Sequence, residues 1–255
     1  MALIDRQETL DLFDQLMQSQ GELRIMRLIG EAKFGKTHFV AKVFPELAKR
    51  EFQAKCCVID LRDKTQEIGD VLHNMYRMLG GESLFPNYYL AYREWQHRPR
   101  VNLQGIRSFF SSIKITLSDS ADEQRFVIRY LTDAFAKDLQ NLNQNPVVLL
   151  FDAVERADEY TQAWLIDNLL MQLAQIDHVR IVLAGRSIPE PAGNYAMNCC
   201  SYELSSIHDE EAFILYCNQI GVSLEEQSIR DIANVVDYNP GLFVDSVIPK
   251  FTDNR

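Results

Sequence analysis

Eight residues near the N-terminus constrain this chain more than any other stretch. They run from Gly30 to Thr37, read Gly-Glu-Ala-Lys-Phe-Gly-Lys-Thr, and match the phosphate-binding pattern G-x-x-x-x-G-K-[ST]. The preceding residues, 22–29, alternate like a strand, and a helix is predicted from Thr37 to Phe44. A strand, a glycine-bearing loop and a helix in this order favour a nucleotide-binding loop over a surface turn that matches by accident.

The residue types in this loop have a direct physical meaning. Gly30 and Gly35 permit a backbone path in which N–H groups turn toward phosphate oxygens, and the N-terminus of the next helix adds a partial positive charge. We expect Lys36 to neutralise the β- and γ-phosphates and the Thr37 hydroxyl to bind Mg²⁺. The nucleotide-binding residues predicted here are Gly30, Glu31, Ala32, Lys33, Phe34, Gly35, Lys36, Thr37 and His38.

Strand and helix patterns alternate through most of the chain. Short apolar runs predict strands at 22–29, 56–61, 146–152, 179–184 and 199–204, with helices between them. Such alternation indicates a three-layer α/β/α fold, with a parallel sheet covered on both faces. Only helical patterns follow residue 206, so we expect a P-loop ATPase α/β domain at 1–206 and a small helical lid domain at 207–255.

Residues 80–121 interrupt this alternation and are expected to form an insertion with structure of its own. The segment is rich in aromatic residues, and a short helix is predicted at 88–96. The pattern at 112–117 alternates like an edge strand or a hairpin arm. The aromatic side chains would either form a partner-binding face or pack against the main domain, and local packing is the favoured interpretation.

Three polar residues follow the later strands, where the carboxyl ends of parallel strands should meet the phosphate loop. Asp152 ends the apolar run 147–151 and matches the Mg²⁺-binding acid of a Walker B motif. Glu155 lies three residues further on and is the candidate for positioning or deprotonating the attacking water. Arg186 follows the fourth strand and is predicted to contact the γ-phosphate. The Asn-Lys-x-Asp signature of GTP-binding folds is missing from the sequence, so adenine is favoured as the base.

Composition narrows the classes of partner. The formal net charge is -10, and a surface this acidic repels a phosphate backbone, so nucleic acid is not expected as a partner. No apolar run is long enough to span a bilayer, and the N-terminus is too polar for a secretory signal. Four of the five cysteines form the adjacent pairs Cys56-Cys57 and Cys199-Cys200, which are poorly placed for disulfides or metal sites. These features favour a cytoplasmic protein with reduced thiols and no membrane partner.

Taken together, the motifs resemble those of the STAND ATPases, a signalling branch related to the AAA+, NACHT and NB-ARC modules. Besides the two Walker motifs, Ile4-Asp5-Arg6-Gln7 is similar to the family's N-terminal h-h-G-R-E motif, and Asn239-Pro240-Gly241-Leu242 is similar to its lid motif. The resemblance implies that Ile4 and Arg6 lie against the adenine and ribose of ATP or ADP, and that Pro240 approaches the adenine. It also implies a sheet order of 5-1-4-3-2.

The resemblance implies a nucleotide-controlled switch. Exchange of ADP for ATP would move the lid and expose a surface for a protein partner or for self-assembly, and slow Mg²⁺-dependent hydrolysis would reset the state. A constitutive AAA+ ring is the alternative; it needs an arginine from a neighbouring subunit, for which Arg98, Arg100 and Arg107 are candidates. A small-molecule kinase is the third and least favoured candidate. STAND proteins usually carry further domains, so we expect either an isolated core module or a part of a longer protein.

Overall fold

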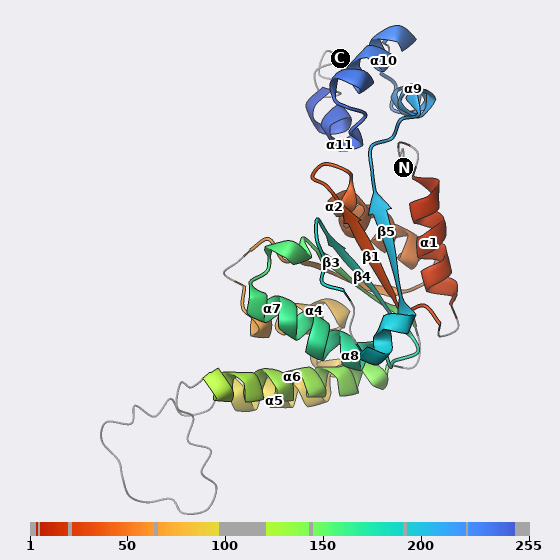
Figure 1. The fold of residues 1–255 in the computed structure, drawn as a ribbon. Coiled ribbons are helices and arrows are strands. Elements are labelled where there is room, and N and C mark those ends of the chain that lie inside the picture. The colour runs from red at the N-terminus through yellow and green to blue at the C-terminus, as the bar shows by residue number, and fades with distance from the viewer. Residues whose placement is uncertain are drawn as a thin grey trace, which may run out of the picture.

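Five parallel strands form the sheet at the centre of the molecule (Figure 1). They are β1 (Ile25–Gly30), β2 (Lys55–Asp60), β3 (Val147–Asp152), β4 (Val179–Gly185) and β5 (Cys199–Leu204). The computed structural model that gives this fold describes residues 4, 6–19, 22–63, 66–96, 121–142, 145–190, 193–222 and 224–247. The strands lie in the order β2-β3-β4-β1-β5, and all neighbouring pairs are parallel. The predicted α/β class is confirmed, as is the predicted order 5-1-4-3-2 when read from the opposite edge.

Helices cover both faces of the sheet. One face carries α1 (Gln7–Gln18), α2 (Lys36–His38), the π-helical turn η1 (Phe39–Val43) and α3 (Phe44–Phe52). The other face carries α4 (Ile68–Leu79), α5 (Pro86–Gln96), α6 (Ala121–Gln140), α7 (Glu159–Trp164), the π-helical turn η4 (Leu165–Leu169) and α8 (Leu170–Leu173). Short 3-10 turns are η2 (Gly81–Ser83), η3 (Val154–Arg156) and η5 (Gly193–Asn198). The chain continues into α9 (Glu210–Gln219), α10 (Glu226–Val235), α11 (Pro240–Leu242) and the π-helical turn η6 (Phe243–Val247).

Alternation along the strands separates two apolar cores. In β3, Leu149 and Phe151 pack with helices α4 to α8, whereas Val148 and Leu150 pack with α1 and α3. All residues of β3 and β4 are buried. Strands without an exposed face need apolar side chains on both sides, which explains their nearly continuous apolar sequences.

The C-terminal helices α9, α10 and α11 enclose a third apolar cluster, beyond the carboxyl end of β5 (Figure 1). Phe213 and Phe243 are fully buried in it, with ring centroids 4.9 Å apart. Ile4, from the other end of the chain, packs in the same cluster. The domain boundary at residue 206 stays a prediction, which the separate cluster supports.

Helix α5, within the predicted insertion, packs against α6. The rings of Phe85 and Phe135 stack with their centroids 5.0 Å apart. The buried Asp138 carboxylate of α6 accepts the N–H of Tyr88 at 2.8 Å and an amide N–H of Asn87, so it satisfies free donors at the start of α5. The aromatic residues of this part of the insertion therefore pack locally, as the favoured interpretation predicts.

Part of the predicted insertion lies outside the described residues. This part includes the predicted strand at 112–117 and the arginines Arg98, Arg100 and Arg107. Within the described ranges, no helix combines the length and the apolar character needed to cross a bilayer. All five cysteines are free, and burial raises the pKa of the Cys56 thiol to about 11 and that of Cys57 to about 12.

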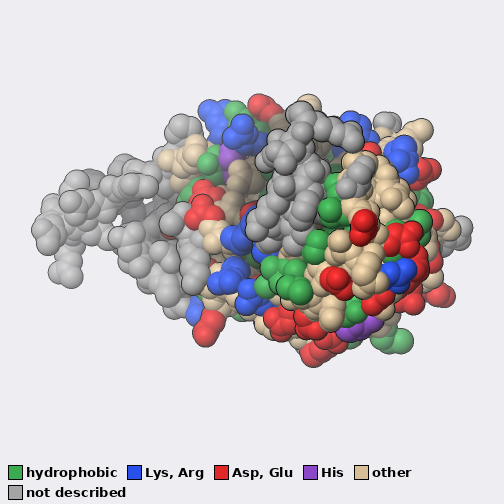
Figure 2. Space-filling model, turned by 90° about the horizontal axis from the view of Figure 1, so that it is seen from above, with side chains coloured by type: hydrophobic (Ala, Val, Ile, Leu, Met, Phe, Trp, Pro, Cys, Tyr) green, Lys and Arg blue, Asp and Glu red, His purple; other side chains and the backbone are tan. Residues whose placement is uncertain are grey.

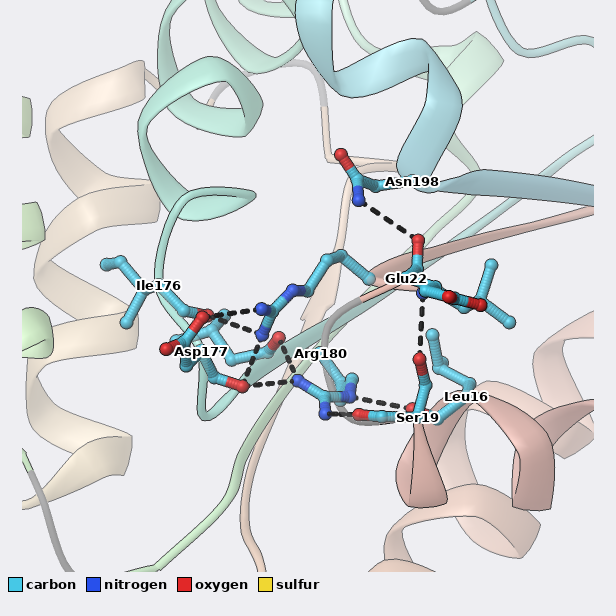
Figure 3. A network of polar contacts seen from close by, with 10 residues as sticks. Leu16, Ser19, Glu22, Ile176, Asp177, Arg180 and Asn198 are labelled. Atoms are coloured by element: carbon cyan, nitrogen blue, oxygen red, sulfur yellow. Dashed lines mark hydrogen bonds and ion pairs between the residues drawn. The ribbon is translucent and has the colours of Figure 1, made fainter.

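Two buried arginines, Arg24 and Arg180, lie at the amino-terminal edge of the sheet, and Arg180 joins this edge to helix α1 (Figure 3). Arg180 of β4 donates to the carbonyl of Leu16 at 2.6 Å and to the carbonyl of Ser19, at the C-terminal end of α1. Arg24 and Arg180 both donate to the carbonyl of Asp177, in the turn before β4. Because the last carbonyls of a helix have no partner within the helix, these contacts fix where α1 ends on the sheet.

Replacing Arg180 with alanine should destabilise the fold. Arg180→Ala leaves the carbonyls of Leu16 and Ser19 without this donor, and we expect the free energy of unfolding to fall by about 3 kcal/mol. For a chain of this size the loss corresponds to a Tm lower by roughly 6–12 °C, measured by circular dichroism. Arg50→Ala removes only the exposed ion pair with Glu51 and should change stability by less than about 0.5 kcal/mol. Equal Tm values for the two variants would contradict the role given to Arg180.

Candidate functional site

A pocket at the carboxyl edge of the sheet brings together most of the predicted site residues. Its volume is about 580 Å³, which suits a small molecule or a cofactor. The predicted residues that line it are Ile4, Arg6, Ala32, Lys33, Phe34, Gly35, Lys36, Thr37, His38, Asp152, Glu155, Arg186 and Pro240. Gly30 and Glu31, also predicted to bind nucleotide, do not line it.

Two residues in the left-handed region of backbone space shape the loop between β1 and α2. Lys33 has a φ of 69° and Gly35 a φ of 95°. Alternation between right-handed and left-handed backbone conformations lets successive N–H groups converge on one anion. Lys36 folds back over the loop, where its ammonium donates to the carbonyls of Gly30 at 2.5 Å and of Glu31 at 2.7 Å. Gly30 and Glu31 therefore position the lysine and form no part of the pocket wall.

The hydroxyl of Thr37 joins the loop to the end of strand β3. It donates to Oδ2 of Asp152 at 2.7 Å, and Asp152 is only 3% exposed. Burial raises the pKa of Asp152, and the hydrogen bond from Thr37 opposes this shift because it stabilises the ionised carboxylate. The pair places two hard oxygen atoms side by side, and oxygen is the ligand that Mg²⁺ prefers.

Glu155 reaches the pocket from a strained turn after β3. Ala153 has a φ of 57°, in the left-handed region that disfavours a side chain, and the turn η3 follows it. The Oε2 atom of Glu155 is buried and has no hydrogen-bond partner among the described residues. Gly185 of β4 leaves room for this oxygen, since a Cβ atom there would lie 2.8 Å from it. A buried oxygen with a spare acceptor site fits the predicted contact with a water molecule.

Charged groups from separate elements act on one another across the pocket. Burial lowers the pKa of Lys36, while the negative charges of Glu155 and Asp152 raise it and Arg186 lowers it. Arg186 follows β4 and is exposed, and it makes no hydrogen bond or ion pair with the described part of the chain. Its guanidinium is therefore available to a ligand in the pocket.

Arg62 lines the pocket but was missed by the sequence analysis. It follows β2, and its Nε donates to Oδ1 of Asp60 at 2.8 Å. Asp60 pairs in register with Asp152 on the neighbouring strand, and the charge of Arg62 lowers the pKa of Asp152. Asp60 could have pointed to this part of the pocket, because it is an acid at the carboxyl end of a strand, where ligands of parallel sheets bind.

The C-terminal helices provide another part of the wall. Pro240 is the first residue of α11, and the residues missed on this side are Tyr216, Gly241, Val244 and Asp245. The side chain of Arg6 donates to the carbonyl of Ser205 at 2.7 Å, just before these helices. The predicted Ile4, Arg6 and Pro240 thus line the same pocket as the phosphate loop, although they come from opposite ends of the chain.

Positive side chains dominate the pocket although the chain is acidic. The lining contains seven Lys or Arg residues and three Asp or Glu residues, whereas the net charge of the chain is -10. Figure 2 shows a group of Lys and Arg side chains to the left of the central grey residues, with most Asp and Glu side chains of that view below and to the right. A cationic pocket in an acidic protein favours an anionic ligand.

Comparison with solved structures identifies the fold. A Walker-type ATPase of Pyrococcus abyssi superposes with a TM-score of 0.52 and 15% identity over 95% of this chain and 66% of its own. Cdc6p from Pyrobaculum aerophilum superposes with a TM-score of 0.51 and 14% identity, over 94% of this chain and 58% of its own. Drosophila ORC bound to DNA superposes with a TM-score of 0.51 and 11% identity, over 96% of this chain and 56% of its own. No protein-family model and no curated protein sequence matches the chain. The chain therefore has the fold of a P-loop NTPase and spans between about half and two thirds of the structures it resembles.

Asp152→Asn should leave the protein at least as stable as the wild type at neutral pH. Because burial raises the pKa of Asp152, its charged form costs stability above the folded-state pKa, and that cost disappears below the unfolded-state pKa. The amide is neutral at every pH and still accepts the Thr37 hydrogen bond. We expect the Tm of the variant to equal or exceed that of the wild type at about pH 7, and the gain to shrink toward about pH 4. A large loss of Tm at neutral pH would mean that the carboxylate is needed for folding.

Proposed function

We propose that the chain binds ATP and ADP and hydrolyses ATP slowly with Mg²⁺, as a STAND-type switch that controls assembly or signalling through a protein partner. The observation that carries this proposal is the meeting of Lys36, Glu155 and the Thr37–Asp152 pair in one cation-lined pocket. The similarity in fold to a Walker-type ATPase, to Cdc6p and to ORC supports a nucleotide-dependent role.

Thr37 and Asp152 fit a magnesium ion. Their oxygens are 2.7 Å apart, and in nucleotide sites Mg²⁺ usually takes one or two protein oxygens together with phosphates and water. Thr37 Oγ1 and the Asp152 carboxylate would hold the ion, directly or through water. When bound, it supplies positive charge that offsets the negative charge of the phosphates.

The chain's own groups divide the work of transferring the γ-phosphoryl group to water. Loop N–H groups and the Lys36 ammonium hold the β- and γ-phosphates. Glu155 accepts a proton from the attacking water, whose oxygen bonds to the γ-phosphorus while the bond to the ADP oxygen breaks. Arg186 stabilises the charge on the γ-phosphate oxygens. The products are ADP and inorganic phosphate.

The two sides of the pocket provide the means for a switch. Lys36 and Arg186 belong to the sheet side, whereas Tyr216, Pro240 and Val244 come from the C-terminal helices. A ligand shifts the equilibrium between two arrangements only by the difference in its affinity for them. In this proposal Arg186 reaches the γ-phosphate in only one of the two arrangements, so ATP favours that arrangement, whereas ADP has no γ-phosphate and does not.

A ring-forming AAA+ ATPase is the second candidate, and the similarity in fold to Cdc6p and ORC favours it. That ORC structure is bound to DNA, so the sequence-based expectation against nucleic acid gains no support from the comparisons. Fluorescence anisotropy with a labelled duplex would measure DNA binding directly. Turnover that rises steeply with protein concentration would favour the ring over the switch, and a phosphorylated product other than free phosphate would indicate a kinase.

Denaturing the purified protein and identifying the released nucleotide tests the proposal. We expect ADP in a nearly stoichiometric amount, detected by ion-exchange chromatography. Lys36→Ala should release little nucleotide, because losing the ammonium removes roughly 2–4 kcal/mol of binding, or about 30- to 1000-fold in Kd. Lys49→Ala, an exposed lysine of α3 outside the pocket, is the matched control. Nucleotide that stays bound to Lys36→Ala at the wild-type level would show that the loop assignment is wrong.

Glu155→Gln should separate binding from hydrolysis. The amide keeps the shape of the side chain but cannot take a proton from water, so we expect phosphate release to slow by roughly 100- to 10,000-fold. The Kd for ATP should change by less than about threefold, as measured by titration calorimetry. Glu159→Gln, an exposed carboxylate of α7 outside the pocket, is the control. A wild-type rate of phosphate release by Glu155→Gln would remove this residue from the mechanism.

A further inference from the structure

The segment Asn239–Asp245, here called the lid segment, touches the phosphate loop directly at three points. The backbone N–H of Gly241 donates to the carbonyl of Lys33 at 2.8 Å. The side-chain amide of Asn239 donates to the carbonyl of Ala32 at 3.3 Å. The ammonium of Lys33 lies 2.9 Å from Oδ2 of Asp245. Two of these contacts involve loop carbonyls, so the lid segment contacts the backbone of the loop itself.

The lid segment is held in the geometry that these contacts need. Oδ1 of Asn239 accepts the N–H of Leu242 at 3.0 Å and caps helix α11, which fixes its Nδ2 on the side that faces Ala32. Pro240, at the first position of the helix, has a fixed φ and no N–H to satisfy. The donors of the lid segment are therefore set in place before any ligand is considered.

Holding a carbonyl also orients an N–H. In a trans peptide unit the C=O and N–H point in opposite directions, so a carbonyl of Ala32 or Lys33 that faces the lid segment turns the N–H of Lys33 or Phe34 away from it. Lys33 has a left-handed φ of 69°, which disfavours a residue with a side chain. The two hydrogen bonds thus stabilise a loop conformation that Lys33 would otherwise leave. Left-handed residues in a loop of this kind are what allow neighbouring N–H groups to converge on an anion.

Gly241 is the point of closest approach between the two segments. A Cβ atom at this position would lie 2.0 Å from the carbonyl oxygen of Lys33 and within 2.9 Å of its carbonyl carbon and Cα. Gly241 itself does not have a left-handed φ, so alanine suits its backbone conformation. A single methyl group there would separate the lid segment from the loop without straining helix α11.

We infer that the lid segment is a positioning element for the phosphate loop. It holds the Ala32 and Lys33 carbonyls outward, so the loop N–H groups are preset for the diphosphate or triphosphate of the nucleotide. Gly241 and Asn239 act on phosphate binding through the loop and need not touch the phosphates. The inference rests on the proposed function, since it concerns the same pocket.

Pyrophosphate distinguishes this role from a lid that only covers the base. Pyrophosphate with Mg²⁺ engages the loop and has neither adenine nor ribose to contact the C-terminal helices. We expect Gly241→Ala to bind pyrophosphate about tenfold more weakly than the wild type in titration calorimetry, because the loop loses donors that hold it in shape. Gly69→Ala is the matched control, because a Cβ in helix α4 would meet only Trp95 at 3.7 Å, and its affinity should equal that of the wild type.

A second variant tests the same role without adding bulk. Asn239→Ser keeps a good N-cap for α11 but is too short to reach the Ala32 carbonyl, and it should weaken pyrophosphate binding about threefold. Wild-type pyrophosphate affinity in both variants, with ADP affinity reduced, would overturn the inference and leave the proposed function standing. If Gly241→Ala fails to fold, the affinity of Asn239→Ser decides alone. A wild-type protein that binds neither pyrophosphate nor ADP would overturn both.

Discussion

A buried carboxylate needs a partner to stay ionised, and the end of strand β3 places Asp152 under this constraint. The hydroxyl of Thr37 meets the carboxylate at 2.7 Å, and the positive charge of Arg62, just after the neighbouring strand β2, favours its ionised form. The same hydrogen bond ties the start of α2, and with it the phosphate loop, to the centre of the sheet. The contact that makes the buried acid tolerable therefore also fixes the distance between the loop and the acid, on which the rest of the pocket depends.

The strand order decides what lies between these two groups. Strand β4 separates β1 from β3, so Arg186 leaves the sheet between the phosphate loop and the end of β3. The buried Arg27 of β1 reinforces this arrangement, since it donates to the carbonyl of Ile188 at 2.6 Å and to Glu190 at 2.8 Å, in the loop that carries Arg186. One strand thus holds both the phosphate loop and the loop after β4, which explains why a charged side chain occupies the interior of a central strand.

The phosphate loop, the acid at the end of β3 and Arg186 could be predicted from the sequence, because each is marked by a local pattern. The loop has its glycine motif, and the other two follow apolar strand patterns. Arg62, Tyr216 and Asp245 were not readable, because their place in the pocket depends on which strands are neighbours and where the C-terminal helices lie. Even the strand order was predicted from a family resemblance, since periodicity does not reveal it. For Gly30 and Glu31 nucleotide binding stays a prediction, because the motif covers the whole loop whereas the structure shows their carbonyls accepting hydrogen bonds from Lys36.

Net charge alone does not decide which partners this chain accepts. At physiological ionic strength the screening length is about 8 Å, so a small anion inside the pocket responds mainly to the seven cationic and three acidic residues that line it. The overall charge of -10 affects mainly the binding of large ligands, which contact a wide area of the protein surface. A nucleic-acid duplex is such a ligand, and its binding would depend on the surface it meets, because in Figure 2 a group of Lys and Arg side chains lies beside a surface that carries mostly Asp and Glu. Composition therefore argues against nucleic acid only as an average over the surface, while the local arrangement of charge decides which ligand a given part of the surface attracts.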